Sequence, residues 1–473
     1  MQSLQEFFEY DGVVDSTEFY QEPIPICQHN IYKYLPFYII ETSTNKYKII
    51  LPETQKSVVE LLCIEKLNNL QEFSDELPSM DKIKQKEFAN QKLYSIEFES
   101  TADFGMEELL AQFYLTYVNQ FNFETWYEPL SNIVIESSTG KKFPVLPEAV
   151  LVPLNKAKIE IIAELHQSTA QGKYLNACMK EIRELSSDIF MAKLPGQLNP
   201  GDRFFFKMNT RSAKDSWFYR EQNLFSSIML KNKEESGSGG PTKKPLRKCE
   251  ASTITEVISA MIGSERVTSD CNSYLQWKVP DENKPPLQVV IQEWVDFPPE
   301  LEFRCFCYQG KITAINQLCW DKYIDYLDSD ASLKNQIVTS VLTLNSLVHD
   351  LLPWKNYILD VIYDRENQIA QICEFNPWGP YSCTGSQLFS WELDSDILFS
   401  TSPDTPPVFR TLRPFMKVET QFCLFIKSPV FKLAPSFEQL LARSVPRCPC
   451  CRRKTDPKNF VLPPTKLYQI NNQ

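Results

Sequence analysis

The chain has 473 residues and a formal net charge of −11, with 43% apolar and 23% charged residues. This length exceeds what one small hydrophobic core accommodates, so we expect a globular protein of two or three lobes. Residues 405–473 carry 12 Lys/Arg against 3 Asp/Glu, which leaves 37 against 57 in residues 1–404. An acidic body disfavours nucleic-acid binding, except through the basic tail around RCPCCRRK at 447–454.

Targeting and cofactor signals are few. No apolar run reaches the roughly 18 residues needed to cross a bilayer, and the N-terminus does not have the form of a signal peptide. We therefore expect a cytoplasmic protein without membrane contact, whose scattered cysteines are mostly reduced. The sequence has three histidines and neither a phosphate-binding glycine loop nor a dinucleotide fingerprint, which disfavours histidine-based hydrolysis and the common nucleotide folds. The cysteines near 450 lack a second ligand pair for zinc.

In chain order, residues 1–115 form an N-terminal region of unknown role with extended, aromatic-rich stretches such as YKYLPFYIIET. A helical pattern follows in GMEELLAQFYLTYVNQF, and Trp126 with Pro-bounded strands in NFETWYEPLSNIVIESSTGKKFPVLP then suggests a new lobe. EAVLVPL predicts a strand and KYLNACMKEIRELSSDIFMAKL a helix. The Gly-, Ser- and Lys-rich segment 231–248 predicts a mobile loop inside the domain 116–400, and residues 401–473 form a basic extension.

Three strong strand signals follow the loop, in PLQVVIQEWVDF, LEFRCFCYQGKITAINQLCW and NYILDVIYDRENQIAQICEFNP. The second contains a hairpin-turn sequence at 308–311 and the third another at 364–367. TITEVISAMIG and SLKNQIVTSVLTLNSLVHDLL have helical spacing. This half of the chain is therefore predicted to be α+β, with antiparallel sheets.

The first candidate cluster lies in FFFKMNTRSAKDSWF. Lys207 ends an aromatic strand, and a loop with further polar side chains follows, comprising Asn209, Arg211, Lys214 and Asp215. Three cations near a strand end suit a polyphosphate where no glycine loop is available. An ordinary solvated turn explains the same residues.

The second cluster is the strand VVIQEW, with Val290, Gln292, Glu293 and Trp294. An exposed backbone here would be able to pair with the edge of an adenine. The alternative is an ordinary core strand.

The third cluster is EFRCF at 302–306. Period-two alternation places Glu302 and Arg304 on one face of a strand, and Phe303 and Cys305 on the other. A structural ion pair and a phosphate contact both explain the charged face.

The fourth cluster brings together Asp360, Glu374 and Asn376. A hairpin turning at 364–367 would place Asp360 opposite Glu374 and Asn376, which share one face of their strand. Carboxylate and carboxamide oxygens are ligands that suit magnesium bridging phosphates. The sequence therefore suggests a hard-cation site.

Taken together, these segments resemble the cell division cycle protein 123 family, a branch of the ATP-grasp fold. The resemblance is carried by EWVDFPPELEFRCF, EFNPWG with LFSW, and FETWYEPLSN with FPVLP, between about residues 121 and 391. It implies a two-lobed ATP-grasp-like domain that clamps ATP with Mg²⁺. By the same resemblance, phosphates would be contacted by Lys207 and Arg304, adenine by 290–294 and the metal by Asp360, Glu374 and Asn376, with Lys214 and Asp215 shaping the phosphate side.

Family members act in the eukaryotic cytosol as assembly factors for translation initiation factor 2. They bind its gamma subunit and promote its union with the alpha subunit. The resemblance thus implies an ATP-binding chaperone with a link to the cell cycle. No ligase or transferase product goes with that role, and the sequence names no catalytic residue.

The sequence departs from the family pattern in three places. Glu374 stands where Asp is expected, and the distance from Asp360 contains one residue more, which a longer hairpin tip or a β-bulge must absorb. Gln317 is followed by Leu-Cys-Trp where the family tends to show Arg-Asp-Tyr. Turnover is therefore less expected than binding.

Three hypotheses remain open from the sequence. The first is the ATP-binding assembly chaperone. The second is an ATP-grasp ligase that activates a carboxylate as an acyl phosphate and joins it to an amine, with Arg304 and Lys214 steadying the intermediate. The third is a scaffold whose nucleotide site has degraded.

Overall fold

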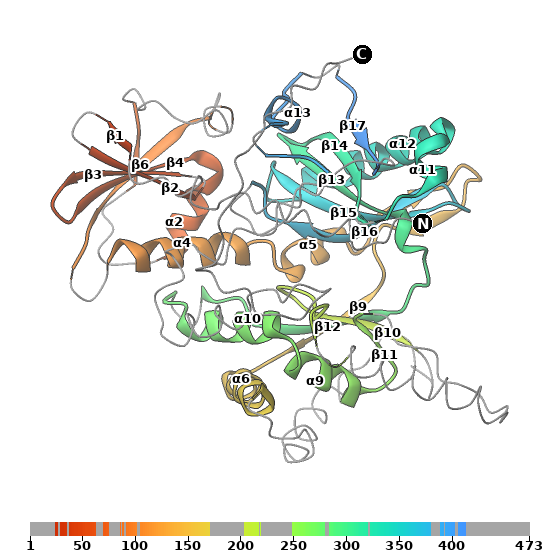
Figure 1. The fold of residues 1–473 in the computed structure, drawn as a ribbon, viewed down its shortest axis with the longest axis horizontal. Helices are drawn as coiled ribbons and strands as arrows, with labels where there is room; N and C mark the ends of the chain where they lie inside the picture. The colour runs from red at the N-terminus through yellow and green to blue at the C-terminus, as the bar shows by residue number, and fades with distance from the viewer. Residues whose placement is uncertain are drawn as a thin grey trace, which may run out of the picture.

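The computed structural model describes the following parts of the chain: residues 24–26, 29–35, 37–62, 70–74, 86, 88, 91–101, 105–170, 203–216, 218, 248–279, 283–319, 322–379, 388–391, 393–402 and 405–412. The helix expected at 173–194, the loop at 231–247 and the basic stretch 447–454 lie outside these residues. Figure 1 shows the described elements arranged around three main sheets.

The N-terminal sheet is antiparallel and has the strand order β1-β2-β3-β4-β6-β5. Helix α2 (Lys56–Leu62) packs beside helix α4 (Met106–Asn119), after the short turn η1 (Glu53–Gln55). The extended stretches and the helix expected from the sequence are confirmed here. The strands are β1 (Ile24–Ile26), β2 (His29–Leu35), β3 (Phe37–Ser43), β4 (Lys46–Pro52), β5 (Gln71–Glu72) and β6 (Leu93–Glu99).

Trp126 lies in a helix, α5 (Phe123–Leu130), and the strands predicted in the same segment follow this helix. Phe123, Trp126 and Leu130 are buried at the i, i+3 and i+7 positions of one helical face, which favours a helix despite its Pro129. A small hairpin follows, formed by β7 (Val134–Glu136) and β8 (Lys142–Pro144).

The four-stranded sheet is antiparallel with the order β11-β10-β12-β9. One face is covered by α6 (Lys156–Ala170), α9 (Ile254–Ile262) and α10 (Glu265–Gln276), which share a core with it. The strand in EAVLVPL is confirmed as β9. The four strands are β9 (Ala149–Pro153), β10 (Phe204–Met208), β11 (Glu250–Ala251) and β12 (Gln288–Glu293).

The five-stranded sheet has the order β16-β15-β13-β14-β17 and is antiparallel except for the β14–β17 pair. Both predicted hairpins are confirmed, and the first turns through Gln309 and Gly310, which both have positive φ angles. Helix α12 (Ala331–Val348) lies against β16, β15 and β14. The strands are β13 (Glu302–Tyr308), β14 (Lys311–Gln317), β15 (Tyr357–Asp364), β16 (Ile369–Asn376) and β17 (Val408–Arg410).

Short helical segments connect these elements: η4 (Pro299–Leu301), α11 (Asp325–Ser329), η5 (His349–Leu351) and α13 (Ser395–Leu398). The largest core joins the N-terminal sheet, α4, α5, the five-stranded sheet and α12. A second, aromatic core on the other face of the five-stranded sheet contains Phe306, Trp378 and Trp391. The described chain is thus α+β with antiparallel sheets, as predicted. None of its described helices combines the length and the apolar character required to traverse a bilayer.

Candidate functional site

The four-stranded sheet has two faces, one covered by its helices and one that faces away from them, and side chains alternate between the two along each strand. Phe204, Phe206 and Met208 point into the helix-covered core, so Lys207 lies on the opposite face. Lys207 pairs in register with Val290 of β12, which therefore shares that face. Lys207 is 4% exposed. A buried lysine requires a compensating partner, because an unpaired charge is costly away from water.

That partner comes from the five-stranded sheet. The Lys207 ammonium donates a hydrogen bond to Oε1 of Glu374 on β16, and it also lies 5.9 Å from the centre of the Phe123 ring. Burial tends to raise the pKa of Glu374, but Lys207 and Lys214 outweigh this and lower it below its ordinary value. Glu374 is therefore ionised. The contact links the two sheets through opposite charges.

Arg304 and Asp360 form a second pair within the five-stranded sheet. They are cross-strand neighbours on β13 and β15, with distances of 2.8 Å from Nε to Oδ1 and 2.7 Å from Nη2 to Oδ2. Both residues are buried. This bidentate geometry is the strong form of a carboxylate–guanidinium contact. Asn376 adds a bond from Nδ2 to Asp360 Oδ2 at 3.2 Å.

The register of the β15–β16 hairpin brings the carboxylates together. Asp360 stands opposite Glu374, as the sequence predicted. Val361 stands opposite Ile372, so Cys373 is an extra residue in β16 and forms a β-bulge. The residue in excess of the family spacing is thus absorbed by a bulge.

Glu302 and Lys214 complete the cluster. Burial raises the pKa of the Glu302 carboxyl above its ordinary value, although Lys214 opposes this shift. Burial lowers the pKa of Lys214, but the surrounding carboxylates of Glu302, Glu374 and Asp360 outweigh it, so the net shift is upward. Lys214 lies among many protein atoms, but its side chain still reaches solvent. It is therefore placed at the solvent-facing side of an acidic site.

These residues fit a metal only in part. Asp360, Glu374 and Asn376 supply oxygen donors of the type magnesium prefers. However, both carboxylates are already neutralised by protein cations, and Asn376 presents its amide N–H to Asp360. Among the described residues, no group of three or more His, Cys, Asp or Glu side chains has a spacing suited to holding a metal ion. Magnesium binding thus requires these contacts to rearrange.

Asn209 has a structural environment. Its Nδ2 donates to both carboxylate oxygens of Glu124, at 3.0 and 2.9 Å, and to the carbonyl of Pro286 at 2.9 Å. Its Oδ1 accepts from the Gln288 N–H at 3.0 Å. Burial raises the pKa of Glu124, while the hydrogen bond from Asn209 opposes the shift. The sequence reasoning missed Glu124, although a lone acid next to buried aromatic residues in NFETWY was a usable signal.

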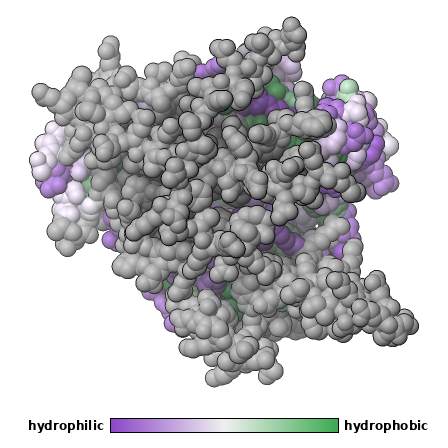
Figure 2. All heavy atoms as spheres, in the orientation of Figure 1, coloured by the Kyte–Doolittle hydropathy of each residue, from purple (hydrophilic) through white to green (hydrophobic). Residues whose placement is uncertain are grey.

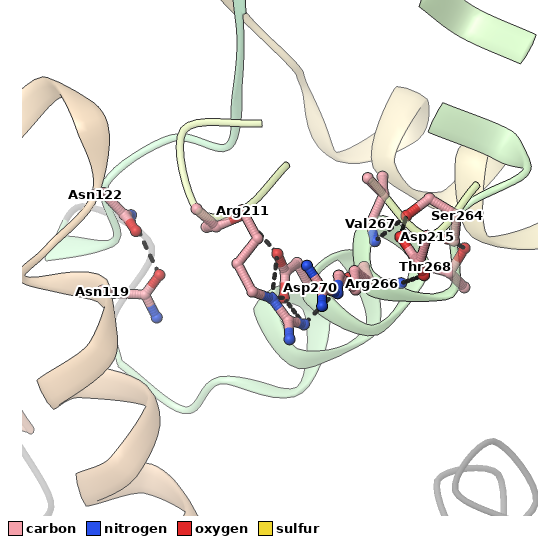
Figure 3. A network of polar contacts seen from close by, with 10 residues as sticks. Asn119, Asn122, Arg211, Asp215, Ser264, Arg266, Val267, Thr268 and Asp270 are labelled. Atoms are coloured by element: carbon pink, nitrogen blue, oxygen red, sulfur yellow. Dashed lines mark hydrogen bonds and ion pairs between the residues drawn. The ribbon is translucent and has the colours of Figure 1, made fainter. Parts of the chain in front are cut away.

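Arg211 and Asp215 turn toward α10 (Figure 3). Arg211 Nε lies 2.9 Å from Asp270 Oδ1. Asp215 accepts from Ser264 Oγ at 2.6 Å and from the Arg266 N–H at 3.1 Å. These contacts place Asp215 at the N-terminus of α10 and Arg211 against its middle, and neither side chain takes part in the contact between Lys207 and Glu374.

The backbone of β12 is not exposed, which corrects one prediction. Residues 288–292 pair with β9 on one side, and residues 289–293 pair with β10 on the other. Val290 and Gln292 are buried, and the Trp294 N–H donates to the Arg203 carbonyl at 3.2 Å. An adenine edge could therefore meet unpaired backbone only around Glu293 and Trp294, where the β9 pairing has ended.

Gln317 has a structural role at the departure from the family pattern. Its Nε2 donates to the carbonyls of Cys319 at 2.6 Å and Lys322 at 2.9 Å, and its Oε1 accepts from the Leu412 N–H at 2.9 Å. The side chain fixes the loop that follows β14 against the end of β17. Trp320 lies outside the described residues.

Replacing Arg211 with methionine is expected to lower the free energy of unfolding by at most about 1 kcal/mol, because its ion pair with Asp270 is partly exposed. The affinity of this variant for Mg-ATP is expected to stay within about twofold of the wild-type affinity, which is the variation expected when the replaced residue makes no contact with the ligand. Urea unfolding and titration calorimetry measure the two quantities. A loss of affinity without a loss of stability would show instead that Arg211 takes part in nucleotide binding.

The fold and these contacts define a class of protein: an α+β protein in which opposing antiparallel sheets meet across a cluster of paired charges. Residues 244–423 match the D123 family model. This part of the chain is similar to that family, whose relatives include cell division cycle protein 123 (Cdc123).

Similar curated proteins carry two kinds of name. A "Translation initiation factor eIF2 assembly protein" of Xenopus laevis is 27% identical over 146 residues, which is 30% of this chain and 41% of the relative. A "Cell division cycle protein 123" of Eremothecium gossypii is 28% identical over 141 residues, 29% of this chain and 37% of the relative. The chain therefore matches about two-fifths of these relatives' length.

Among solved structures, Cdc123 from Schizosaccharomyces pombe is 20% identical, with a TM-score of 0.41. The matched region covers 63% of this chain and 98% of the S. pombe chain. A C-terminally truncated form of the same protein gives a TM-score of 0.43.

Proposed function

We propose that this protein is a cytoplasmic, Mg-ATP-binding assembly chaperone that acts on translation initiation factor eIF2 through its gamma subunit. Relatives that bear the name of eIF2 assembly proteins support the partner. The departures from the family pattern at Glu374 and after Gln317 favour ATP as a bound ligand over ATP as a consumed substrate. Turnover is not part of the proposal.

One observation carries the nucleotide part of the proposal: Lys207 and Glu374 meet from opposite sheets, directly beside the buried Arg304–Asp360 pair. A site built for phosphate and metal needs cations and carboxylates side by side. Charges held between two separate sheets can exchange partners when a ligand enters, because in the described part of the chain no strand of one sheet pairs with a strand of the other.

In the proposed complex, Lys207 and Lys214 hold phosphate oxygens, while Glu374, Asp360 and Asn376 hold Mg²⁺. The ion would neutralise phosphate charge and fix the phosphates in one orientation. Arg304 keeps Asp360 oriented through its bidentate contact. ATP would thus replace the direct Lys207–Glu374 contact as the link between the sheets, and so set their separation for the partner.

The test is a binding assay between the purified full chain and the isolated eIF2 gamma subunit, with and without Mg-ATP. We expect binding that strengthens when Mg-ATP is present, since closure of the two sheets is coupled to nucleotide. ADP release is measured in parallel and is expected to stay at background. Absence of binding in both conditions would contradict the partner, and stoichiometric ADP release would favour the ligase alternative.

A further inference from the structure

We propose that the outer edge of β7, together with the facing surface of α12, forms a docking surface for an extended, uncharged segment of a partner protein. This surface shares no residue with the charged site, and the inference does not depend on ATP binding. We refer to it as the β7–α12 groove.

The backbone of β7 has a free edge. The N–H of Ser137 donates to Lys141 O, and the N–H of Val145 donates to Ile133 O, on either side of the Ile135–Phe143 pair. Hydrogen-bonding positions alternate along an antiparallel pair. Val134 and the residue two further along, Glu136, therefore direct their N–H and C=O groups away from β8. In the described part of the chain, β8 is the one strand that pairs with β7.

A groove of about 610 Å³ lies beside this edge. Its walls come from β7 and the start of the following turn, from α12, and from the end of the β15–β16 turn. Figure 1 shows the small β7–β8 hairpin next to α12. The residues lining it are Ile135, Glu136, Ser138, Ala331, Ser332, Asn335, Gln336, Thr339, Ser340, Thr343, Gln368 and Ile369.

The wall formed by α12 carries no charge. Within its 18 residues the single charged side chain is Lys334, which is engaged with the Asp328 carbonyl at 2.7 Å. The exposed positions recur at helical spacing and are occupied by neutral residues, with Ser, Thr and Asn beside Leu342 and Leu347. In Figure 2 the described atoms on the right of the view, over α12 and the hairpin, are mostly pale or purple.

The chemistry of the groove selects its occupant. The outward N–H and C=O groups of Val134 and Glu136 can form hydrogen bonds with the backbone of another extended segment, as when a strand is added to the edge of a sheet. Hydroxyl and amide side chains on the opposite wall satisfy neutral polar side chains. Glu136 is the one charged residue of the lining, so an acidic side chain would lose water there beside a like charge, and basic side chains beyond the first would find no partner. Its carboxylate, within an acidic body, opposes an acidic segment most strongly.

The probe is a library of synthetic eight-residue peptides composed of Ser, Thr, Val, Asn and Gln, tested for binding to the full chain by fluorescence polarisation. A bound peptide is then remade with N-methyl groups at odd or at even positions. We expect methylation of one set to weaken binding about tenfold, because it removes the N–H groups that pair with β7, and methylation of the other set to have little effect.

Two variants give the matched control. Thr339→Glu places a carboxylate in the groove and is expected to weaken binding about tenfold, whereas Ser346→Glu, on the same helix but outside the lining, is expected to leave it unchanged. Thermal unfolding verifies that both variants fold. The proposal is overturned if no neutral peptide binds, if the methyl position or Thr339→Glu makes no difference, or if sedimentation shows that β7 pairs two copies of the chain.

Discussion

Replacing Asp360 with alanine is expected to destabilise the folded protein by about 3–5 kcal/mol, because it leaves Arg304 buried without its partner. The guanidinium cannot shed its proton, so the cost of the uncompensated charge is not relieved by a shift of its ionisation. Urea-induced unfolding, followed by tryptophan fluorescence, measures the loss as a lower midpoint.

A double variant separates the charge from the packing. Arg304→Met combined with Asp360→Leu removes both charges and fills similar volume, so it is expected to recover most of the stability that Asp360→Ala loses. If Asp360→Ala cost less than about 1 kcal/mol, the pair would behave like an exposed salt bridge, and the burial of the cluster would be in question.

The second large effect concerns the nucleotide. Replacing Lys207 with methionine is expected to weaken Mg-ATP binding by about 1.5–3 kcal/mol, roughly 10- to 150-fold, the range for a hydrogen bond to a charged group. Titration calorimetry on the full chain measures it. Lys207 is a better probe than Asp360, since the loss of Asp360 acts on stability as well as on binding.

Removing Lys207 also leaves Glu374 without its contact, so a control must restore the balance of charge. Lys207→Met with Glu374→Gln removes both charges and is expected to fold like the wild type, so it controls for the stability of the single variant. Its Mg-ATP binding is expected to be poor, because it lacks a phosphate contact and a proposed metal ligand together. Wild-type affinity in the single variant would exclude Lys207 from the nucleotide site and leave its contact with Glu374 as a structural link between the sheets.

Features that depend on local pattern could be predicted from the sequence. The turns at 308–311 and 364–367 are bounded by strands with clear β-propensity, and a hairpin fixes which residues face each other once its turn is known. The turn alone would place Asp360 opposite Cys373, and the extra residue, absorbed as a bulge, brings Glu374 to that position instead. The two faces of EFRCF followed from period-two alternation in the same way.

Features that depend on distant partners were not predictable. Asn209 and Asp215 stand in one loop with Lys214, but their partners lie on α5, β12 and α10, tens of residues away in the sequence. The edge or interior position of β12 depends on β9, which precedes it by more than a hundred residues. FETWYEPL contains aromatic residues typical of strands, yet burial of one helical stripe decided its structure.

The bulge at Cys373 changes what an altered chain length does to this protein. Ile372 stands opposite Val361 and Glu374 opposite Asp360, so Cys373 is the one residue of this stretch that has no cross-strand partner. Deleting Cys373 alone would remove the bulge and leave both pairs, and the two faces of the strand, as they are. A single deletion elsewhere in the same strand would instead exchange the faces beyond it, so that Glu374 would turn toward the large apolar core and Phe375 toward Lys207. The bulge is therefore the position at which this strand tolerates a change of one residue in length.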